Sequence, residues 1–260
     1  MSSQNKLGST ISAILITRDE SRHLAKCLET LKFCNEVIVV DHGSSDDTVA
    51  IARHMGARVI QTTDWPGFGP QKQRALSEAR SVWILSIDAD ERVTPQLTAE
   101  ILLAIKQSHA DGYFIKRRSQ FLGRWMRFGG WYPDYVLRLA KRELACFDQA
   151  LVHERLLVNG RVEHLKQHFL HYSYYDISDV LRKQRTYALL SGQRIRQYRG
   201  AHINVMLTLL RALWTFNRLY LLQLGFLDGR QGLISAIFKS QEVFWKYVAA
   251  EFDATSSQDK

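Results

Sequence analysis

The chain has 260 residues, 46% of them hydrophobic, and its 35 Lys and Arg outnumber 26 Asp and Glu to give a net charge of +9. These values allow one large domain, or one domain with an appendage. The sequence contains no internal repeat and no long run of low complexity. Three widely spaced cysteines contain no CxxC pair, which argues against a disulfide framework and for a reducing compartment.

The two ends of the chain are polar. No apolar segment opens the sequence, so we expect no signal peptide and a cytoplasmic protein. Residues 1–9 and 254–260 are expected to be short tails.

The positive charge is concentrated in the second half of the chain. Residues 1–110 hold 12 Lys and Arg against 13 Asp and Glu, whereas residues 111–260 hold 23 against 13. A basic surface formed by the second half would suit nucleic acid, an anionic membrane or a phosphorylated substrate.

The first half alternates apolar runs with amphipathic segments. The runs predict buried strands at 11–17, 36–41, 58–62 and 82–88. The segments between and after them predict a helix at 18–34, a turn and a helix within 42–57, and helices at 70–80 and 94–108. Ser44 or Ser45 is the expected N-cap of the second helix, and Thr94 caps the fourth with Pro95 at its first position.

This alternation predicts an α/β fold, a mostly parallel sheet with helices on both faces. Such sheets bind ligands beyond the carboxyl ends of their strands. Asp41 follows one expected strand, and Asp88 and Asp90 end another. We therefore expect these acids at a ligand-binding edge.

The pattern changes after residue 110. Further strands are predicted at 112–122, 135–140, 151–158 and 161–172, with Asn159-Gly160 as a tight hairpin turn between the last two. Helices return at 177–199, 203–229 and 232–252. A small mixed-strand region followed by C-terminal helices is therefore expected.

The segment 203–226 is long enough to resemble a membrane span. Arg211, Asn217 and Arg218 interrupt it, and each Arg at mid-membrane costs roughly 2.5 to 3.5 kcal/mol. This favours helices that lie on a membrane surface. An ordinary helical subdomain or a dimer interface is the alternative.

Three carboxylates follow the fourth strand, at Asp88, Asp90 and Glu91. Neighbouring like charges repel, so a positive group is expected beside them. An Asp-x-Asp at a strand tip can hold Mg²⁺ or Mn²⁺ together with substrate phosphates, and such a cation neutralises a diphosphate leaving group. Exposed acids in a turn are the alternative.

Three segments together carry a family resemblance: 14–21 (ILITRDES), 39–48 (VVDHGSSDDT) and 84–91 (ILSIDADE). They resemble the inverting glycosyltransferases of family 2, which have the GT-A fold. Further stretches look like one branch of it, the lipopolysaccharide inner-core β-1,4-glucosyltransferases that act on the first heptose: 129–139, 151–156, 170–174 and 226–233. One departure is His42, where the family pattern usually has a second acid.

The resemblance implies a role for each part of the chain. Residues 9–110 would bind the nucleotide-sugar, 111–175 would bind the acceptor in the same catalytic domain, and 176–254 would form an amphipathic helical region. Asp90 would be the principal metal ligand, helped by Asp88 and by His171, which would reach the diphosphate or its metal. The expected nucleotide-sugar contacts are Asp41, Lys72, Arg74 and Asp88.

Inversion by direct displacement needs a base that takes the proton of the acceptor hydroxyl. Glu154 is the first candidate and Asp134 the alternative. Glu154 would otherwise only pair with Arg138 or Arg155.

These expectations lead to a peripheral enzyme on the inner face of the inner membrane. It would move glucose from UDP-glucose to an inner-core heptose with Mg²⁺ or Mn²⁺. A polyprenyl-phosphate or capsule glycan acceptor is the alternative. A nucleic-acid-binding protein is a distant third, because it leaves the acids at the strand ends unexplained.

Overall fold

The computed structural model describes residues 10–148, 154–199 and 204–252. The expected polar tails and residues 151–153 of an expected strand lie outside this part. The chain divides into two compact units. The first unit comprises residues up to Arg117 together with Tyr135–His171, and the second comprises Arg118–Asp134 and everything from Tyr172 onward. The three-part functional division expected from the sequence stays a prediction.

The first unit contains an α/β half followed by further strands. Its helices are α1 (Ser21–Glu29), α2 (Thr48–His54), α3 (Phe68–Ser77) and α4 (Pro95–Gln107). Its strands, three of which continue into the second unit, are β1 (Ile11–Thr17), β2 (Glu36–Asp41), β3 (Arg58–Gln61), β4 (Trp83–Ser86), β5 (Glu91–Val93), β6 (Gly112–Phe121), β8 (Asp134–Lys141), β9 (Ala145–Phe147), β10 (Leu156–Val158) and β11 (Val162–Tyr174).

The main sheet has the strand order β3-β2-β1-β4-β8-β6-β11-β5. The first four strands are parallel, with Thr17 opposite Asp41 and Ile14 opposite Ser86. Strand β8 then runs antiparallel to β4, and β5 antiparallel to β11. The expected α/β fold with a mostly parallel first half is confirmed, and the carboxyl ends of β1, β2 and β4 share one edge.

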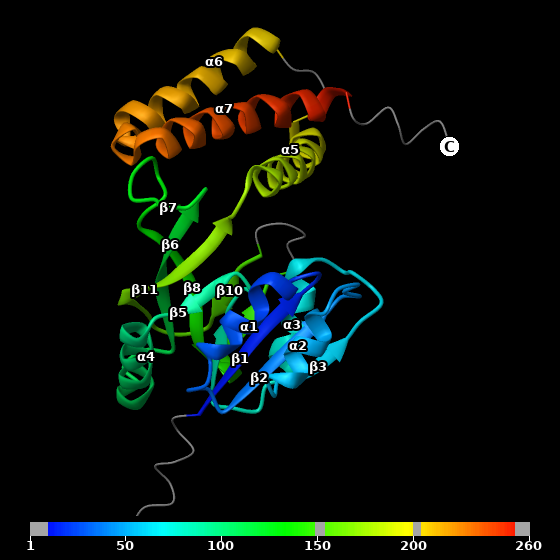
Figure 1. Ribbon diagram of the computed structural model, residues 1–260, viewed down its shortest axis with the longest axis vertical. Coiled ribbons are helices and arrows are strands. Elements are labelled where there is room, and N and C mark those ends of the chain that lie inside the picture. The colour runs from blue at the N-terminus through cyan, green and yellow to red at the C-terminus, as the bar shows by residue number, and fades with distance from the viewer. Residues whose placement is uncertain (1–9, 149–153, 200–203, 253–260) are drawn as a thin grey trace, which may run out of the picture. The chain divides into compact units, whose positions relative to one another are not determined.

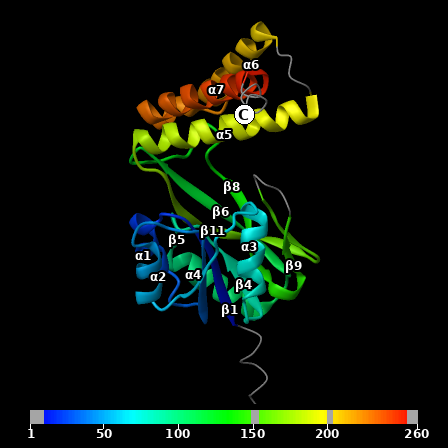
Figure 2. The same ribbon diagram turned by 90° about the vertical axis from the view of Figure 1, so that its right-hand side faces the viewer.

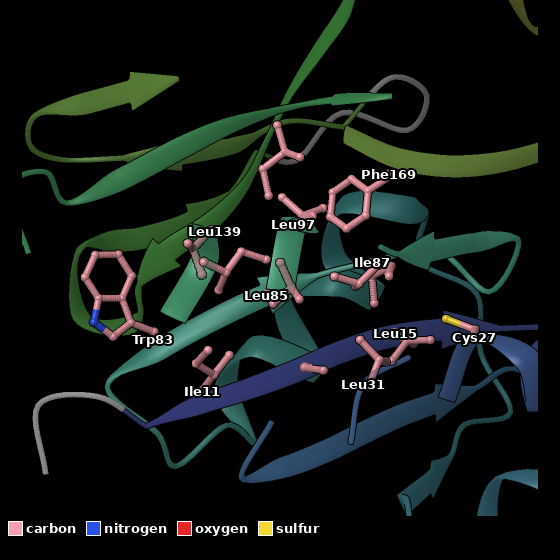
Figure 3. Packing of buried hydrophobic residues seen from close by; sticks show 14 of the residues in the cluster. Ile11, Leu15, Cys27, Leu31, Trp83, Leu85, Ile87, Leu97, Leu139 and Phe169 are labelled. Atoms are coloured by element: carbon pink, nitrogen blue, oxygen red, sulfur yellow. The ribbon is translucent and has the colours of Figure 1, made fainter. Parts of the chain in front are cut away.

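Alternate residues of β1 pack on opposite faces of the sheet. Ile11 and Leu15 belong to a core formed with α1, α2 and α4, whereas Ile14 packs with the residues of α3. Figure 2 shows α1 and α2 on one side of these strands and α3 on the other. Trp83 and Phe169 are among the large side chains of the first core (Figure 3). Each such side chain contributes about 1.5 to 3 kcal/mol by leaving water.

Helix ends agree with the sequence at α4 and differ from it at α2. Thr94 caps α4, its hydroxyl accepting a hydrogen bond from the backbone N–H of Leu97 at 3.1 Å. Helix α2 begins at Thr48, later than expected, because both serines proposed as caps have other partners. Ser44 bonds to Asp41, and Ser45 bonds to Asp19 of the β1–α1 loop.

The prediction of a hairpin at Asn159-Gly160 is wrong. Strand β10 pairs with the unpredicted β9, Leu156 opposite Phe147, in a separate two-stranded sheet. Asn159 instead donates its backbone N–H to the carbonyl of Leu144 at 2.8 Å. The tight turn therefore leads out of one sheet and into another.

The second unit is mainly helical. It contains β7 (Arg124–Trp125), α5 (Ile177–Arg199), α6 (Val205–Asn217) and α7 (Gly229–Phe252). Figure 1 shows α5 and α6 packed along α7. The single helix expected over 203–229 is wrong, because the α-helix ends at Asn217. A π-helical segment, Arg218–Leu222, and a 3₁₀ turn, Gly225–Asp228, follow it.

Asp228 fixes the chain at this interruption. Its carboxylate is buried and accepts hydrogen bonds from the backbone N–H groups of Arg127 and Phe128, at 2.9 and 2.8 Å. The indole of Trp131 also donates to Ser235 at 2.8 Å. These bonds tie the loop after β7 to the start of α7.

Candidate active site

A buried ammonium group links two of the predicted site residues. Lys72 projects from α3, and its Nζ lies 3.0 Å from Oδ1 of Asp88 and 2.7 Å from Oε1 of Glu154. Its side chain is only 8% exposed. Asp88 lies two residues beyond β4, so the group stands at the carboxyl-end edge where ligands of such sheets bind.

Arg138 of β8 supplies a second positive charge. Its Nη2 lies 2.5 Å from Oδ2 of Asp88 and 3.0 Å from Oε1 of Glu91. The other oxygen of Glu91 accepts the backbone N–H of Asp88 at 3.0 Å. Two cations therefore offset the repulsion among the acids that follow β4. Lys72 was predicted to lie in the site, whereas Arg138 was considered only as a partner for Glu154. An Arg within the apolar strand 135–140 was the available signal.

These cations keep Asp88 ionised. Burial would raise the pKa of its carboxyl, but the charges of Arg138 and Lys72 hold that pKa well below its usual range. The same pairing raises the pKa of Arg138 despite its burial. Asp88 is therefore a permanent anion at neutral pH.

Asp90 and His171 form a pair beside this network. Strand β11 runs antiparallel to β5 with His171 opposite Glu91, which places the imidazole next to the Asp-x-Asp turn. Nε2 of His171 lies 3.4 Å from Oδ2 of Asp90, and the two side chains are 13% and 18% exposed. The two side chains therefore lie side by side, and each is partly exposed to solvent.

Asp90 and His171 could bind a divalent cation whose remaining ligands come from the substrate. Within the described ranges, no group of three or more His, Cys, Asp or Glu side chains is arranged to hold a metal. Mg²⁺ and Mn²⁺, however, commonly take one or two protein ligands plus phosphate oxygens and water. A carboxylate beside an imidazole is compatible with that pattern.

Asp41 lies at the end of β2 and is fully buried. Its carboxylate accepts hydrogen bonds from the hydroxyl of Thr17 at 3.0 Å and from the backbone N–H and hydroxyl of Ser44. It thereby joins the loops that follow β1 and β2. Its predicted contact with the nucleotide stays a prediction.

The structure does not gather the remaining predicted residues around Lys72. Arg74 makes a two-pronged ion pair with Asp64, at 2.9 and 2.6 Å. Asp134 begins β8 but belongs to the second unit. Their roles stay predictions.

A model of glycosyl transferase family 2 matches residues 12–149, which include β1 to β4 and the Asp-x-Asp turn. This chain belongs to glycosyltransferase family 2. Among its relatives is the lipopolysaccharide core biosynthesis glycosyltransferase LpsC of Rhizobium meliloti. The two are 29% identical, over 91% of this chain and 93% of LpsC. An uncharacterised glycosyltransferase of Rickettsia conorii is also 29% identical, over 87% of this chain and 84% of the relative.

Comparison with a solved structure supports the fold of this family 2 glycosyltransferase. The crystal structure of TarS residues 1–349 from S. aureus, in complex with UDP-GlcNAc, superposes with a TM-score of 0.50. The match covers 96% of this chain and 92% of that TarS fragment, at 15% identity. The expected GT-A fold is confirmed, and the chain is a glycosyltransferase.

Proposed function

We propose that this glycosyltransferase moves glucose from UDP-glucose to the first heptose of the lipopolysaccharide inner core, with inversion. The observation that carries the proposal is the grouping of Lys72, Asp88 and Glu154, with Asp90 and His171, at the ligand-binding edge of the sheet. Similarity to LpsC along nearly the whole chain supports a core-oligosaccharide acceptor. The TarS complex supports a UDP-sugar donor.

The donor is held by its diphosphate and its nucleoside. Asp90 and His171 would hold Mg²⁺ or Mn²⁺, which would neutralise the diphosphate leaving group. Asp88, also expected as a metal ligand, instead pairs with Lys72 and Arg138. Lys72 and Arg74 on α3 add positive charge on the nucleotide side, and Asp41 orders the loops around the nucleoside.

Glu154 is the proposed base. The acceptor hydroxyl oxygen forms a bond to the anomeric carbon, and the bond from that carbon to the diphosphate oxygen breaks as UDP leaves. The hydroxyl proton passes to the carboxylate of Glu154. Nζ of Lys72 lies 2.7 Å from Oε1 of Glu154 and holds the carboxylate in position.

The first experiment is sugar transfer from a panel of UDP-sugars to heptose-bearing lipopolysaccharide precursor, with and without Mg²⁺ or Mn²⁺. We expect transfer of one sugar, dependent on the cation and lost in Asp90→Ala and His171→Ala. Glu29→Gln, an exposed change on α1, is the control and should remain active. Polyprenyl phosphate and a capsule glycan are assayed as alternative acceptors, and transfer only to one of them would overturn the heptose acceptor. Full activity in Asp90→Ala would contradict the proposed role of Asp90 in holding the metal.

A second experiment separates the two candidate bases. Glu154→Gln should lower kcat by at least about a hundredfold with little change in KM, because general base catalysis contributes about 10²- to 10⁴-fold. Asp134→Asn should retain most of kcat. The opposite ranking would make Asp134 the base.

We also propose that the second unit docks on the inner face of the inner membrane. None of the described helices is both long and apolar enough to cross a bilayer. Helix α6 nevertheless exposes seven large apolar side chains, each 44% to 65% exposed: Val205, Met206, Leu207, Leu209, Leu210, Leu213 and Trp214. The second unit also holds 15 Lys and Arg against 8 Asp and Glu, the balance expected for anionic lipid.

Vesicle flotation tests this surface. The protein should float with vesicles of phosphatidylethanolamine and phosphatidylglycerol, less with neutral phosphatidylcholine, and poorly after Leu210→Gln with Leu213→Gln. The matched control changes Leu102 and Leu103, two exposed leucines of α4 in the first unit, to Gln. Equal flotation of the two double variants would overturn the assignment to α6.

A further inference from the structure

The guanidinium of Arg92 binds the backbone of the turn that carries Asp90. Nη1 of Arg92 donates hydrogen bonds to the carbonyl of Ala89 at 2.8 Å and to the carbonyl of Glu91 at 2.6 Å. Ala89 and Glu91 are the two neighbours of Asp90 in the sequence. A single nitrogen therefore holds the carbonyl groups on both sides of Asp90.

The same guanidinium fastens this turn to helix α1. Nη2 of Arg92 donates to the backbone carbonyl of His23 at 2.8 Å. Helix α1 packs Leu24, Cys27 and Leu28 into the first core, so it provides a fixed support. Arg92 is only 7% exposed, so little water competes for its hydrogen bonds.

Two further contacts join α1 to the same turn. Oγ1 of Thr30, the residue that ends α1, accepts the backbone N–H of Val93 at 3.2 Å. The thiol of Cys27 donates to the carbonyl of Asp88, with Sγ and the oxygen 3.6 Å apart. The backbone N–H of Glu91 donates to that same carbonyl at 2.9 Å. The turn is thus supported from Asp88 to Val93.

We propose that Arg92 is a positioning residue for sugar transfer, which fixes the backbone of Asp90 so that its carboxylate stays beside His171 and meets the divalent cation. This rests on the proposed function, because it assumes that Asp90 is a metal ligand. Arg92 acts through the backbone of the turn, to which its Nη1 donates. A guanidinium suits this role because its planar fork of N–H groups reaches several acceptors at once, whereas an ammonium is a compact point charge.

Mn²⁺ binding, titrated by electron paramagnetic resonance in the presence of UDP, measures this positioning without catalysis. Arg92→Ala should weaken Mn²⁺ binding about tenfold to a hundredfold, the usual effect of removing a group that orients a metal ligand. Arg92→Lys keeps the charge but not the fork, so it should also bind Mn²⁺ more weakly than the parent, though by less.

Arg142→Ala is the matched control. Its guanidinium also donates to a backbone carbonyl, that of Ala79 at 3.5 Å. Arg142 directly follows Lys141, which lies opposite Trp83 at the start of β4, whereas the acids lie beyond the end of β4. Arg142→Ala should therefore bind Mn²⁺ like the parent.

Free guanidinium ion separates positioning from general stability. In Arg92→Ala a low concentration of guanidinium chloride should restore part of the Mn²⁺ affinity, because the ion replaces the missing group, whereas sodium chloride at the same concentration should not. A variant that is merely less stable would gain nothing from guanidinium, which denatures proteins. Equal recovery in sodium chloride would contradict the role of the guanidinium group.

The remaining outcomes distinguish this inference from the proposed function. Parental Mn²⁺ affinity in Arg92→Ala would overturn the inference, as would an equal loss in Arg142→Ala. Arg92→Lys takes the place of Arg92→Ala if the latter does not fold. In these cases, loss of Mn²⁺ binding in Asp90→Ala would leave the metal role of Asp90 standing. Parental Mn²⁺ binding in Asp90→Ala, or no binding by the parent, would overturn that role and this inference with it.

Discussion

The ammonium of Lys72 lies between two carboxylates of the first unit, 3.0 Å from Asp88 and 2.7 Å from Glu154. Removing one partner of a buried ion pair leaves the other charges uncompensated. Lys72→Met should therefore lower the free energy of unfolding by about 3 kcal/mol, measured by urea denaturation. Lys72→Arg should lose less. Lys106→Met, at an exposed position on α4, is the control, and equal stability of the two Met variants would contradict the structural role of this ion pair.

The ion pairs of Asp88 should make stability depend on pH in acid. Because the pKa of Asp88 is lower in the folded protein than in the unfolded chain, the unfolded chain binds more protons in the window between the two values. The contribution is fully present above the unfolded pKa, near 4, and is lost as the pH falls through the folded pKa. The stability gap between the parent and Asp88→Asn should thus narrow below pH 4 by about 1.4 kcal/mol per pH unit. A difference in unfolding free energy between the parent and Asp88→Asn that stays constant from pH 6 to pH 3 would contradict this prediction. Glu29→Gln, which removes an exposed carboxylate, is the control for the general effect of acid on stability.

The three thiols should differ sharply in reactivity. Cys27 is fully buried, and burial raises the pKa of its thiol. Burial also raises the pKa of Cys34 to about 12, whereas Cys146 is exposed. Since the thiolate is the nucleophile, one thiol per chain should react rapidly with a disulfide reagent at pH 8 and two only after unfolding. Cys146→Ser should abolish the rapid phase, and a rapid phase that survives would point to Cys34.

The cap of α4 offers a measure of local stability. Thr94→Ala removes the acceptor for the N–H of Leu97 and should cost about 1 kcal/mol in the free energy of unfolding. Thr94→Ser keeps the hydroxyl and should remain near the parent. Equal losses in both variants would show that the methyl group, rather than the hydrogen bond, stabilises this end.

The parallel half of the fold was predictable because its signals are local. Strands β1, β2 and β4 are apolar runs bounded by turn residues, and Thr94-Pro95 marks the start of α4. In contrast, β5 has only three residues, two of them charged, and it exists because β11, about 75 residues later, pairs with it. No local pattern encodes such a strand.

The acids of the candidate site were predictable from the sequence, whereas the basic residues that approach them were less so. Asp88 and Asp90 follow a buried strand, which is visible in the sequence. The approach of Arg138 to Asp88 depends on β8 pairing with β4, and that of His171 to Asp90 depends on β11 pairing with β5. The end of α6 at Asn217 was also not predicted, because apolar residues continue along the sequence through the π-helical segment to Leu222. Backbone geometry, rather than composition, ends that helix.

The central position of β1 has a consequence during synthesis. Its two neighbours are β2, which follows soon along the chain, and β4, which begins at Trp83, roughly 65 residues after β1 ends. At 5 to 20 residues per second a ribosome needs about 3 to 13 s to make that stretch. One edge of an almost wholly apolar strand stays unpaired on the nascent chain for this time, which makes it a ready template for pairing with other chains. In a truncated chain that ends before Trp83, this edge of β1 has no partner strand. Early termination of translation is therefore expected to yield an aggregation-prone fragment rather than a smaller folded domain.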